Sequence, residues 1–290
     1  MAIEGLKIIG ESINDSVPST NRLFTANDID GIVELARSQD EKGAAYIDVN
    51  VGRRTPEFMA DMVQRIQAVT VKPLSIDTPD FDIARAGLEA YDASRAGGQM
   101  PVLNSISPLR LEFFDLYKIR PFMPILMVSE HADGVGSRAN KTAEETYETA
   151  RYMLEQSQQR IPGFDSSQCI IDPGIAPIGS DSENNLKRLL DSLKLMRTDE
   201  NFAGVHVSVG LSNFTVMLPP KRPDGMPVKS ALESAFLTLA MPLGLDMVIG
   251  SMARKYELLE DSHPAMACLR EALEMDGFDV IMRVQEFYSS

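Results

Sequence analysis

The strongest constraint on the fold is an alternation that runs through the chain. Short apolar runs rich in β-branched residues are separated by segments whose apolar residues have helical spacing. This pattern is typical of a parallel sheet with crossover helices. The predicted strands cover residues 6–10, 46–51, 73–77, 102–105, 124–129, 169–172, 205–211 and 247–250. Eight such units in about 250 residues predict a closed (β/α)8 barrel, because an open doubly wound sheet usually has fewer strands and a glycine-rich first turn.

The segments between these runs carry helix signals. Thr55 and Pro56 are typical of a helix start, and Thr142 with Glu145 matches a capping box. The expected helices cover about residues 28–42, 55–66, 81–91, 109–119, 142–159, 186–193 and 229–243. One or two further helices are expected at about 257–288, outside the barrel. We therefore expect residues 1–290 to form a single barrel domain with a helical tail.

Composition excludes several classes of partner. The chain has 28 Lys and Arg against 42 Asp and Glu, a net charge of −14, which disfavours binding to nucleic acid or to an anionic membrane. Cys169 and Cys268 are isolated in apolar stretches, as expected for buried thiols in a reducing compartment. His131, His206 and His263 lack metal-ligand spacing, so we expect no directly bound metal. Without a leader or a long apolar run, the chain is expected to be cytoplasmic.

The polar residues at the predicted strand ends indicate the chemistry, because a barrel of this kind has its active site at the carboxyl ends of its strands. Most of them are carboxylates and carboxamides: Glu11, Asn14, Asp48, Asn50, Asp77, Asn104, Ser105, Asp172, Ser212 and Asn213. A Schiff-base aldolase needs a strand lysine and a metal hydrolase several histidines, and neither is found there. A glycosidase is disfavoured because the chain has no Trp for a sugar platform.

Such a set suits a flat heterocycle with several N–H donors and acceptors along one edge. Each buried polar edge must be matched, because an unmatched group costs about 1–3 kcal/mol. A carboxylate can accept two parallel hydrogen bonds from the aminopyrimidinone edge of a pterin. A pterin is one heterocycle that has such an edge.

Seven phrases, in order and at comparable spacing, resemble those of the pterin-binding methyltransferases. This family includes methyltetrahydrofolate:corrinoid protein methyltransferase and the folate domain of cobalamin-dependent methionine synthase. The phrases are IIGESIN (8–14), YIDVNVG (46–52), LSIDTPD (74–80), LNSIS (103–107), IIDPGIAP (170–177), VGLSNF (209–214) and AFLTLAMPLGLDMVI (235–249).

The resemblance implies a barrel of the dihydropteroate synthase-like type with C-terminal helices, present as a homodimer. Its substrate would be tetrahydrofolate or 5-methyltetrahydrofolate, and its partner a corrinoid protein on a separate chain, because one barrel leaves no room for a corrinoid domain. Some relatives serve methylamine or glycine betaine demethylation in anaerobes, which implies transfer from the methylcorrinoid protein to tetrahydrofolate.

Residue roles follow from the matching phrases. Asp77, Asn104 and Asp172 are expected to hold the pterin edge, and Asn213 to lie near N5 as the catalytic residue. A carboxamide can donate to a neutral N5 or accept from a protonated one without titrating itself. The remaining substrate-binding positions are Ser212, Asp48, Glu11, Asn14, Asn50 and Gly174. One departure is Val216, where some relatives have a Gln three residues after the Asn.

Two other functions stay open. A dihydropteroate synthase-like enzyme shares the barrel but needs a Lys and an Arg late in the barrel, where this chain reads Leu211–Asn213 and Ser251–Arg254. A non-catalytic folate-binding subunit of a methyltransfer complex would need only the pterin pocket. Asp77 and Asp172 could also be helix caps, and Asn104 and Asn213 turn residues.

The acidic charge of the chain raises a question about the folate tail. Its glutamate carries negative charge and needs local positive charge in a protein of this composition. Arg53 and Arg54, directly after the second predicted strand, are the expected tail-binding residues.

Overall fold

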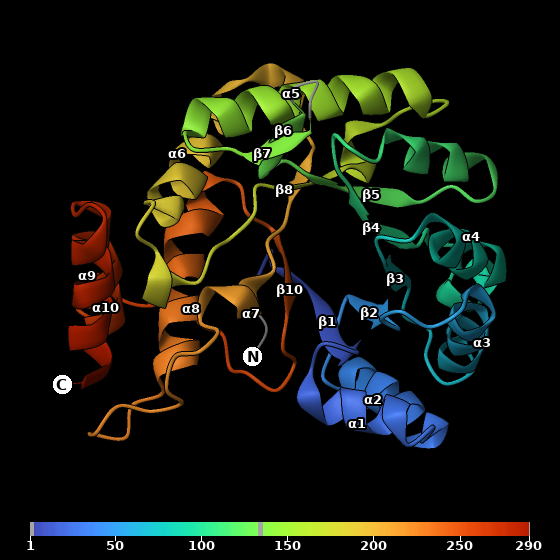
Figure 1. Cartoon of the computed structure of the whole chain (residues 1–290), viewed down its shortest axis with the longest axis horizontal. Coiled ribbons are helices and arrows are strands. Elements are labelled where there is room, and N and C mark those ends of the chain that lie inside the picture. Colours follow the sequence, from blue (N-terminus) through green and yellow to red (C-terminus); the bar gives the residue numbers. More distant parts are fainter. Residues whose placement is uncertain (1–2, 133–135, 290) are drawn as a thin grey trace.

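In a computed structural model that describes residues 3–132 and 136–289, the chain forms a barrel of parallel strands surrounded by helices (Figure 1). The sheet order is β10-β1-β2-β3-β4-β5-β8-β9. The strands are β1 Lys7–Asn14, β2 Tyr46–Asn50, β3 Leu74–Asp77, β4 Val102–Ile106, β5 Met123–Met127, β8 Ile170–Asp172, β9 His206–Val207 and β10 Met247–Gly250. The two end strands meet where Gly210 bridges to Ile249 and the Ile249 N–H donates to the Val209 carbonyl at 2.9 Å. The predicted (β/α)8 barrel is therefore confirmed.

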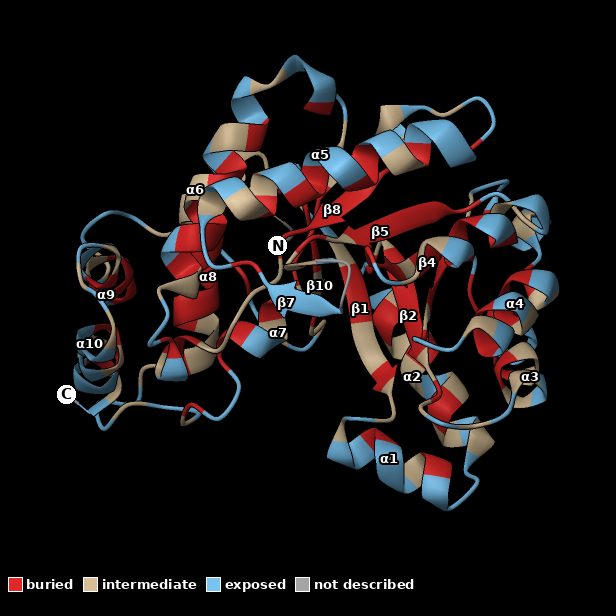
Figure 2. Cartoon of the chain, turned by 45° about the horizontal axis from the view of Figure 1, so that its top comes forward, coloured by how far each residue is buried: buried red, intermediate tan, exposed pale blue. Residues whose placement is uncertain are grey.

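Helices cover the outer face of the sheet and turn their buried sides toward it (Figure 2). Thr55 caps α3 by accepting from the Phe58 N–H, and Thr142 caps α5 by accepting from the Glu145 N–H, as the sequence predicted. The large outer helices are α2 Ile29–Glu41, α3 Pro56–Gln67, α4 Phe81–Ala90, α5 Ala143–Arg160, α6 Asn185–Thr198 and α8 Val228–Ala240.

Three local expectations were wrong. The segment expected as a helix at 109–119 is a 3-10 helix, Leu111–Lys118, whose buried Phe113 and Leu116 lie three residues apart and so share one face of such a helix. The seventh strand does not reach residue 211, because the chain leaves the ladder and forms the single turn α7, Leu211–Phe214. The helical tail begins later than expected, with α9 Pro264–Leu273 and then α10 Phe278–Ser289.

Three elements, one helix and two short strands, had no clear sequence signal. Helix α1, Pro18–Thr25, follows β1 and has no side-chain cap. The strands β6, Glu130–Ala132, and β7, Ser137–Ala139, pair as an antiparallel hairpin after β5. Within the described residues, no helix combines the length and the apolar character needed to cross a membrane.

An apolar layer fills the interior of the barrel, below the carboxyl ends of the strands. Its members come from six strands: Ile9, Tyr46, Val102, Met123, Ile125, Ile170 and Met247. A larger core lies between the sheet and the helices and includes Cys169 and Cys268, which are free and buried as predicted. The barrel is therefore packed through its interior and presents a surface only at its ends.

Candidate functional site

A layer of polar side chains lies above the apolar layer at the carboxyl ends of the strands. Side chains alternate between the two faces of a strand, so residues two positions apart share a face. Ile9 and Glu11, Val102 and Asn104, and Ile170 and Asp172 are such pairs, with the apolar member in the interior layer. The pleat therefore places the predicted polar residues together at the barrel mouth.

These side chains line one cavity of about 460 Å³. Of the predicted residues it contains Glu11, Asn14, Asp48, Asp77, Asn104, Asp172, Gly174 and Asn213. The other lining residues are Thr78, Pro79, Ser105, Arg110, Met127, Ser129, Ile175, Gly210 and Ile249. Ser212 and Asn50 lie outside the lining but contact it through hydrogen bonds. This volume is in the range of a small-molecule site.

Two carboxylates on neighbouring strands interact at one side of the cavity. Asp48 is 1% exposed, and neither of its carboxylate oxygens has a hydrogen-bond partner among the described residues. Burial, and secondly the charge of Asp77, raise the pKa of Asp48 well above its ordinary value. Asn50 donates from Nδ2 to Asp77 Oδ2 at 2.9 Å, while burial raises the pKa of Asp77 as well. The pair therefore favours a protonated Asp48, which can donate a hydrogen bond.

Asp172 lies at another side of the cavity and is held by the turn that follows β8. Its Oδ1 accepts from the Gly174 N–H at 2.7 Å, and burial raises its pKa to about 6. Gly174 has φ +71°, and a Cβ there would lie 2.5 Å from the Ser129 Cβ. Arg188 of α6 donates to the carbonyls of Pro173 and Gly174, each at 3.0 Å. The turn thus requires glycine and is fixed from behind by a buried arginine.

Helix α7 brings Asn213 to the rim of the cavity. Ser212 donates from Oγ to Glu11, whose pKa burial raises. Asn213 is exposed, and its Nδ2 lies so near Gly210 that a Cβ there would approach it to 2.8 Å. Within the described part of the chain its carboxamide makes no hydrogen bond and is free to meet a ligand.

An ion pair behind α7, between buried Glu233 and partly exposed Arg254, was not predicted. Thr215 donates from Oγ1 to Oε1 of Glu233 on α8, and Arg254 donates to the same oxygen. Glu233 and Thr215 are both 0% exposed. Glu233 lies in the buried stretch of α8 and Arg254 in a loop after β10, so no local pattern indicates that they meet.

The predicted tail residues do not line the cavity. Arg54 donates from Nη1 to Asp15 Oδ1 at 2.9 Å and to the Val51 carbonyl at 2.8 Å, and its guanidinium lies 4.3 Å from the centre of the Phe24 ring. Arg53 is exposed outside the cavity. The cationic residue that does line it is Arg110, in the loop after β4. Extending the strand-end survey to this loop would have found it.

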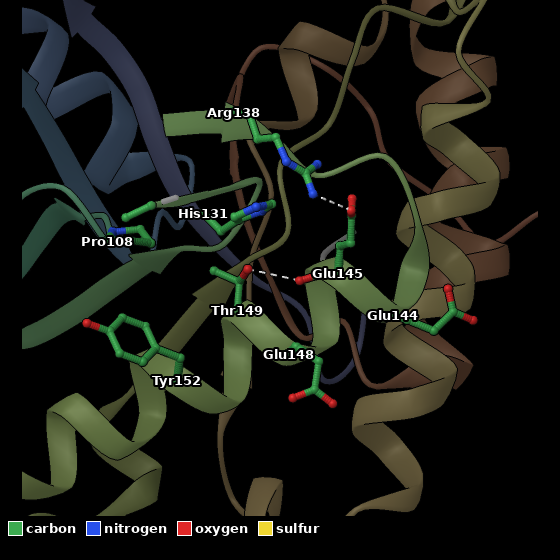
Figure 3. Close-up of a pocket in the computed structure, with 9 residues that line it drawn as sticks. Pro108, His131, Arg138, Glu144, Glu145, Glu148, Thr149 and Tyr152 are labelled. Atoms are coloured by element: carbon green, nitrogen blue, oxygen red, sulfur yellow. Dashed lines mark hydrogen bonds and ion pairs between the residues drawn. The ribbon is translucent and has the colours of Figure 1, made fainter. Parts of the chain in front are cut away.

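A second cavity of about 590 Å³ lies between the β6–β7 hairpin and α5 (Figure 3). It contains none of the predicted site residues, and its walls include Pro108, Tyr152 and Glu148. Arg138 of this lining donates to Glu145 at 2.7 Å, so its positive charge is already paired within the protein. The strand-end cavity is therefore the candidate site.

No cluster of three or more His, Cys, Asp or Glu suited to a metal occurs in residues 3–132 and 136–289.

Comparison with known proteins places these observations in a family. The family model described as pterin binding enzyme matches residues 13–250. Methylcorrinoid:tetrahydrofolate methyltransferase of Eubacterium limosum is 26% identical over 256 residues, covering 83% of each chain. Methionine synthase of Mycobacterium leprae is 25% identical over 253 residues, covering 83% of this chain and 20% of that protein.

Solved structures share the fold. Dihydropteroate synthase of Xanthomonas albilineans has a TM-score of 0.57 at 19% identity, covering 94% of this chain and 93% of that one. The Thermus thermophilus dihydropteroate synthase has the same TM-score at 18% identity, with the same coverage. The match to the family model spans most of the barrel and every residue of the cavity lining except Glu11. The chain belongs to the pterin-binding enzyme family.

Proposed function

We propose that the protein is a methyltransferase that moves a methyl group from the cobalt of a methylcorrinoid protein to N5 of tetrahydrofolate, giving 5-methyltetrahydrofolate. The observation that carries this proposal is the free carboxamide of Asn213 at the rim of a cavity that also contains Asp77, Asn104 and Asp172. The similarity to a methylcorrinoid:tetrahydrofolate methyltransferase supports it.

Asp77, Asn104 and Asp172 would hold the pterin by its polar edge. The carboxylates accept from the ring N–H and exocyclic amino groups, and the carboxamide can both donate and accept. The protonated Asp48 would add a donor for a ring acceptor. The supporting residues act through these: Asn50 orients Asp77, and the Gly174 N–H orients Asp172.

Asn213 would act at N5. In the transfer the N5 lone pair forms the new bond to the methyl carbon, the carbon–cobalt bond breaks with its electron pair left on cobalt, and N5 loses its proton to solvent. The carboxamide oxygen can accept from the N5 hydrogen and so aim the lone pair at the methyl group. Most of the rate enhancement would come from this positioning at about 3–3.5 Å.

The partners follow from the same reaction. We propose that the corrinoid is carried by a separate protein that docks over the barrel mouth, and that the enzyme acts as a cytoplasmic homodimer. A dihydropteroate synthase-like activity has less support, because Arg254, the arginine available late in the barrel, is bound to the buried Glu233. Ser212 and Asn213 stand where a lysine would be required.

Methylcobalamin and tetrahydrofolate under anaerobic conditions test the proposal. Loss of the methyl-Co(III) spectrum with formation of 5-methyltetrahydrofolate is expected for the wild type. Asn213→Ala should lower kcat about a hundredfold, the effect of removing one aligned hydrogen-bonding group at a reacting centre, while tetrahydrofolate still binds. Asn201→Ala, at an exposed asparagine outside the cavity, is the matched control and should leave kcat unchanged. A wild-type protein that binds tetrahydrofolate without any transfer would instead be a non-catalytic folate-binding subunit.

A further inference from the structure

The cavity at the barrel mouth has an uneven distribution of charge. Four acidic side chains line it: Glu11, Asp48, Asp77 and Asp172. Arg110 is the one cationic side chain among its described lining residues. An anionic substrate group entering this acidic protein needs a compensating charge, and this is where the cavity provides one.

Arg110 has weak contacts of its own. Its Nη2 lies 3.5 Å from Ser105 Oγ, at the long limit of a hydrogen bond, and its guanidinium carbon lies 5.6 Å from the centre of the Phe113 ring. It forms no ion pair within 4 Å of a carboxylate in the described part of the chain, in contrast to Arg54, which is bound to Asp15. Its charge acts at longer range on Asp77, where it opposes the rise in pKa caused by burial. Most of its hydrogen-bonding capacity is therefore unused.

The position of Arg110 relative to the pterin residues suggests what it binds. Asn104 lies within β4, whereas Arg110 lies in the loop that leaves the carboxyl end of the same strand. A pterin held by its polar edge at Asp77, Asn104 and Asp172 directs the substituent at its far end out of the barrel. In a folate this substituent is a p-aminobenzoyl group that ends in glutamate.

We infer that Arg110 binds a carboxylate of the folate glutamate tail, and that Arg53 and Arg54 do not. This inference rests on the proposed use of a folate, and it names the residue that distinguishes a folate from a simple pterin. The planar guanidinium can donate two parallel hydrogen bonds to a carboxylate, a geometry that lysine cannot reproduce.

Binding measurements without any corrinoid test the inference. Calorimetric affinities are measured for tetrahydrofolate and for 6-methyltetrahydropterin, which has the same ring without the tail. Arg110→Gln should weaken tetrahydrofolate roughly ten- to a hundredfold, as expected for a lost charge-assisted contact, and should change 6-methyltetrahydropterin less than about threefold. Arg110→Lys should recover part of the affinity. Arg53→Ala, which removes an equal charge outside the cavity, should change neither.

Each other outcome has a distinct meaning. Equal weakening of both ligands by Arg110→Gln would mean that Arg110 acts on the pterin through Asp77, and would overturn the inference. A selective loss in Arg53→Ala would overturn it in favour of the loop after β2. If the wild type binds tetrahydrofolate with the expected dependence on Arg110 but transfers no methyl group, the proposed reaction fails and the tail site stands.

Discussion

Replacing Asp172 with asparagine should have opposite effects on stability and on substrate binding. The side chain is 6% exposed, and burial raises its pKa from 3.8 to about 6. The native state therefore binds the carboxyl proton of Asp172 more tightly than the unfolded state does. The stabilisation that this protonated carboxyl provides is fully present below about pH 4 and is lost as the pH rises through about 6. At 1.36 kcal/mol per unit of pKa, the ionised form costs about 3 kcal/mol at pH 8.

Asp172→Asn keeps an oxygen that can accept from the Gly174 N–H but never ionises. We expect the variant to exceed the wild type in unfolding free energy by up to about 3 kcal/mol at pH 8 and to equal it below pH 4. Urea unfolding over this pH range measures the difference. Asp30→Asn, at an exposed carboxylate outside the cavity, should not show it.

Tetrahydrofolate binding should change in the other direction. The ionised carboxylate accepts from pterin N–H groups, so wild-type affinity should fall as the pH drops through about 6. Asp172→Asn should bind roughly ten- to a hundredfold more weakly at pH 8, the size of a lost charge-assisted hydrogen bond. A variant that is less stable than the wild type at pH 8, or that retains full affinity for tetrahydrofolate, would refute the reasoning.

Two further predictions concern the supports of the site. Gly174→Ala should destabilise the protein by more than Gly97→Ala, because both glycines have positive φ but only Gly174 has a neighbour, Ser129, in the path of a Cβ. The Gly97→Ala change should lower the free energy of unfolding by about 1 kcal/mol. Equal shifts in Tm for the two variants would contradict the clash at Gly174. Thr215 ends α7, the turn that carries Asn213, and its hydroxyl donates to Glu233. Thr215→Val should therefore loosen the position of Asn213 and lower kcat about tenfold, the size of one lost hydrogen bond, with little change in tetrahydrofolate affinity, whereas Thr215→Ser should restore kcat. A parallel loss of affinity in Thr215→Val would indicate a general structural role.

Much of the fold could be predicted because its signals are local. The caps at Thr55 and Thr142 depend on residues within one helical turn, and the structure has both. The 3-10 helix at Leu111–Lys118 cannot be told from an α-helix by sequence, because its apolar spacing fits either form over so short a segment. The short α7 could not be predicted from the sequence. Val209 and Gly210 pair with β10 only when the barrel closes, and the chain leaves the sheet and turns into α7 directly after this pairing.

The candidate site, like the fold, could be predicted from the sequence where local signals determine it and not where tertiary contacts do. Asp77, Asn104, Asp172 and Asn213 reach one cavity, because the alternation along a strand and the common direction of parallel strands determine where their side chains point. The assignment of the tail to Arg53 and Arg54 had only nearness in sequence to support it, and the structure brings neither into the cavity.

The sequence by itself determined that this chain forms a barrel with carboxylates and carboxamides at its mouth, because pleat and helical period act over a few neighbouring residues. Tertiary structure decided which of those groups ionise readily and which are held in place by hydrogen bonds from outer helices. Asp48 meets Asp77 across two strands, and Arg188 reaches Gly174 from an outer helix. Such contacts join elements far apart in the chain, so they exist only once the barrel has closed and its helices have packed.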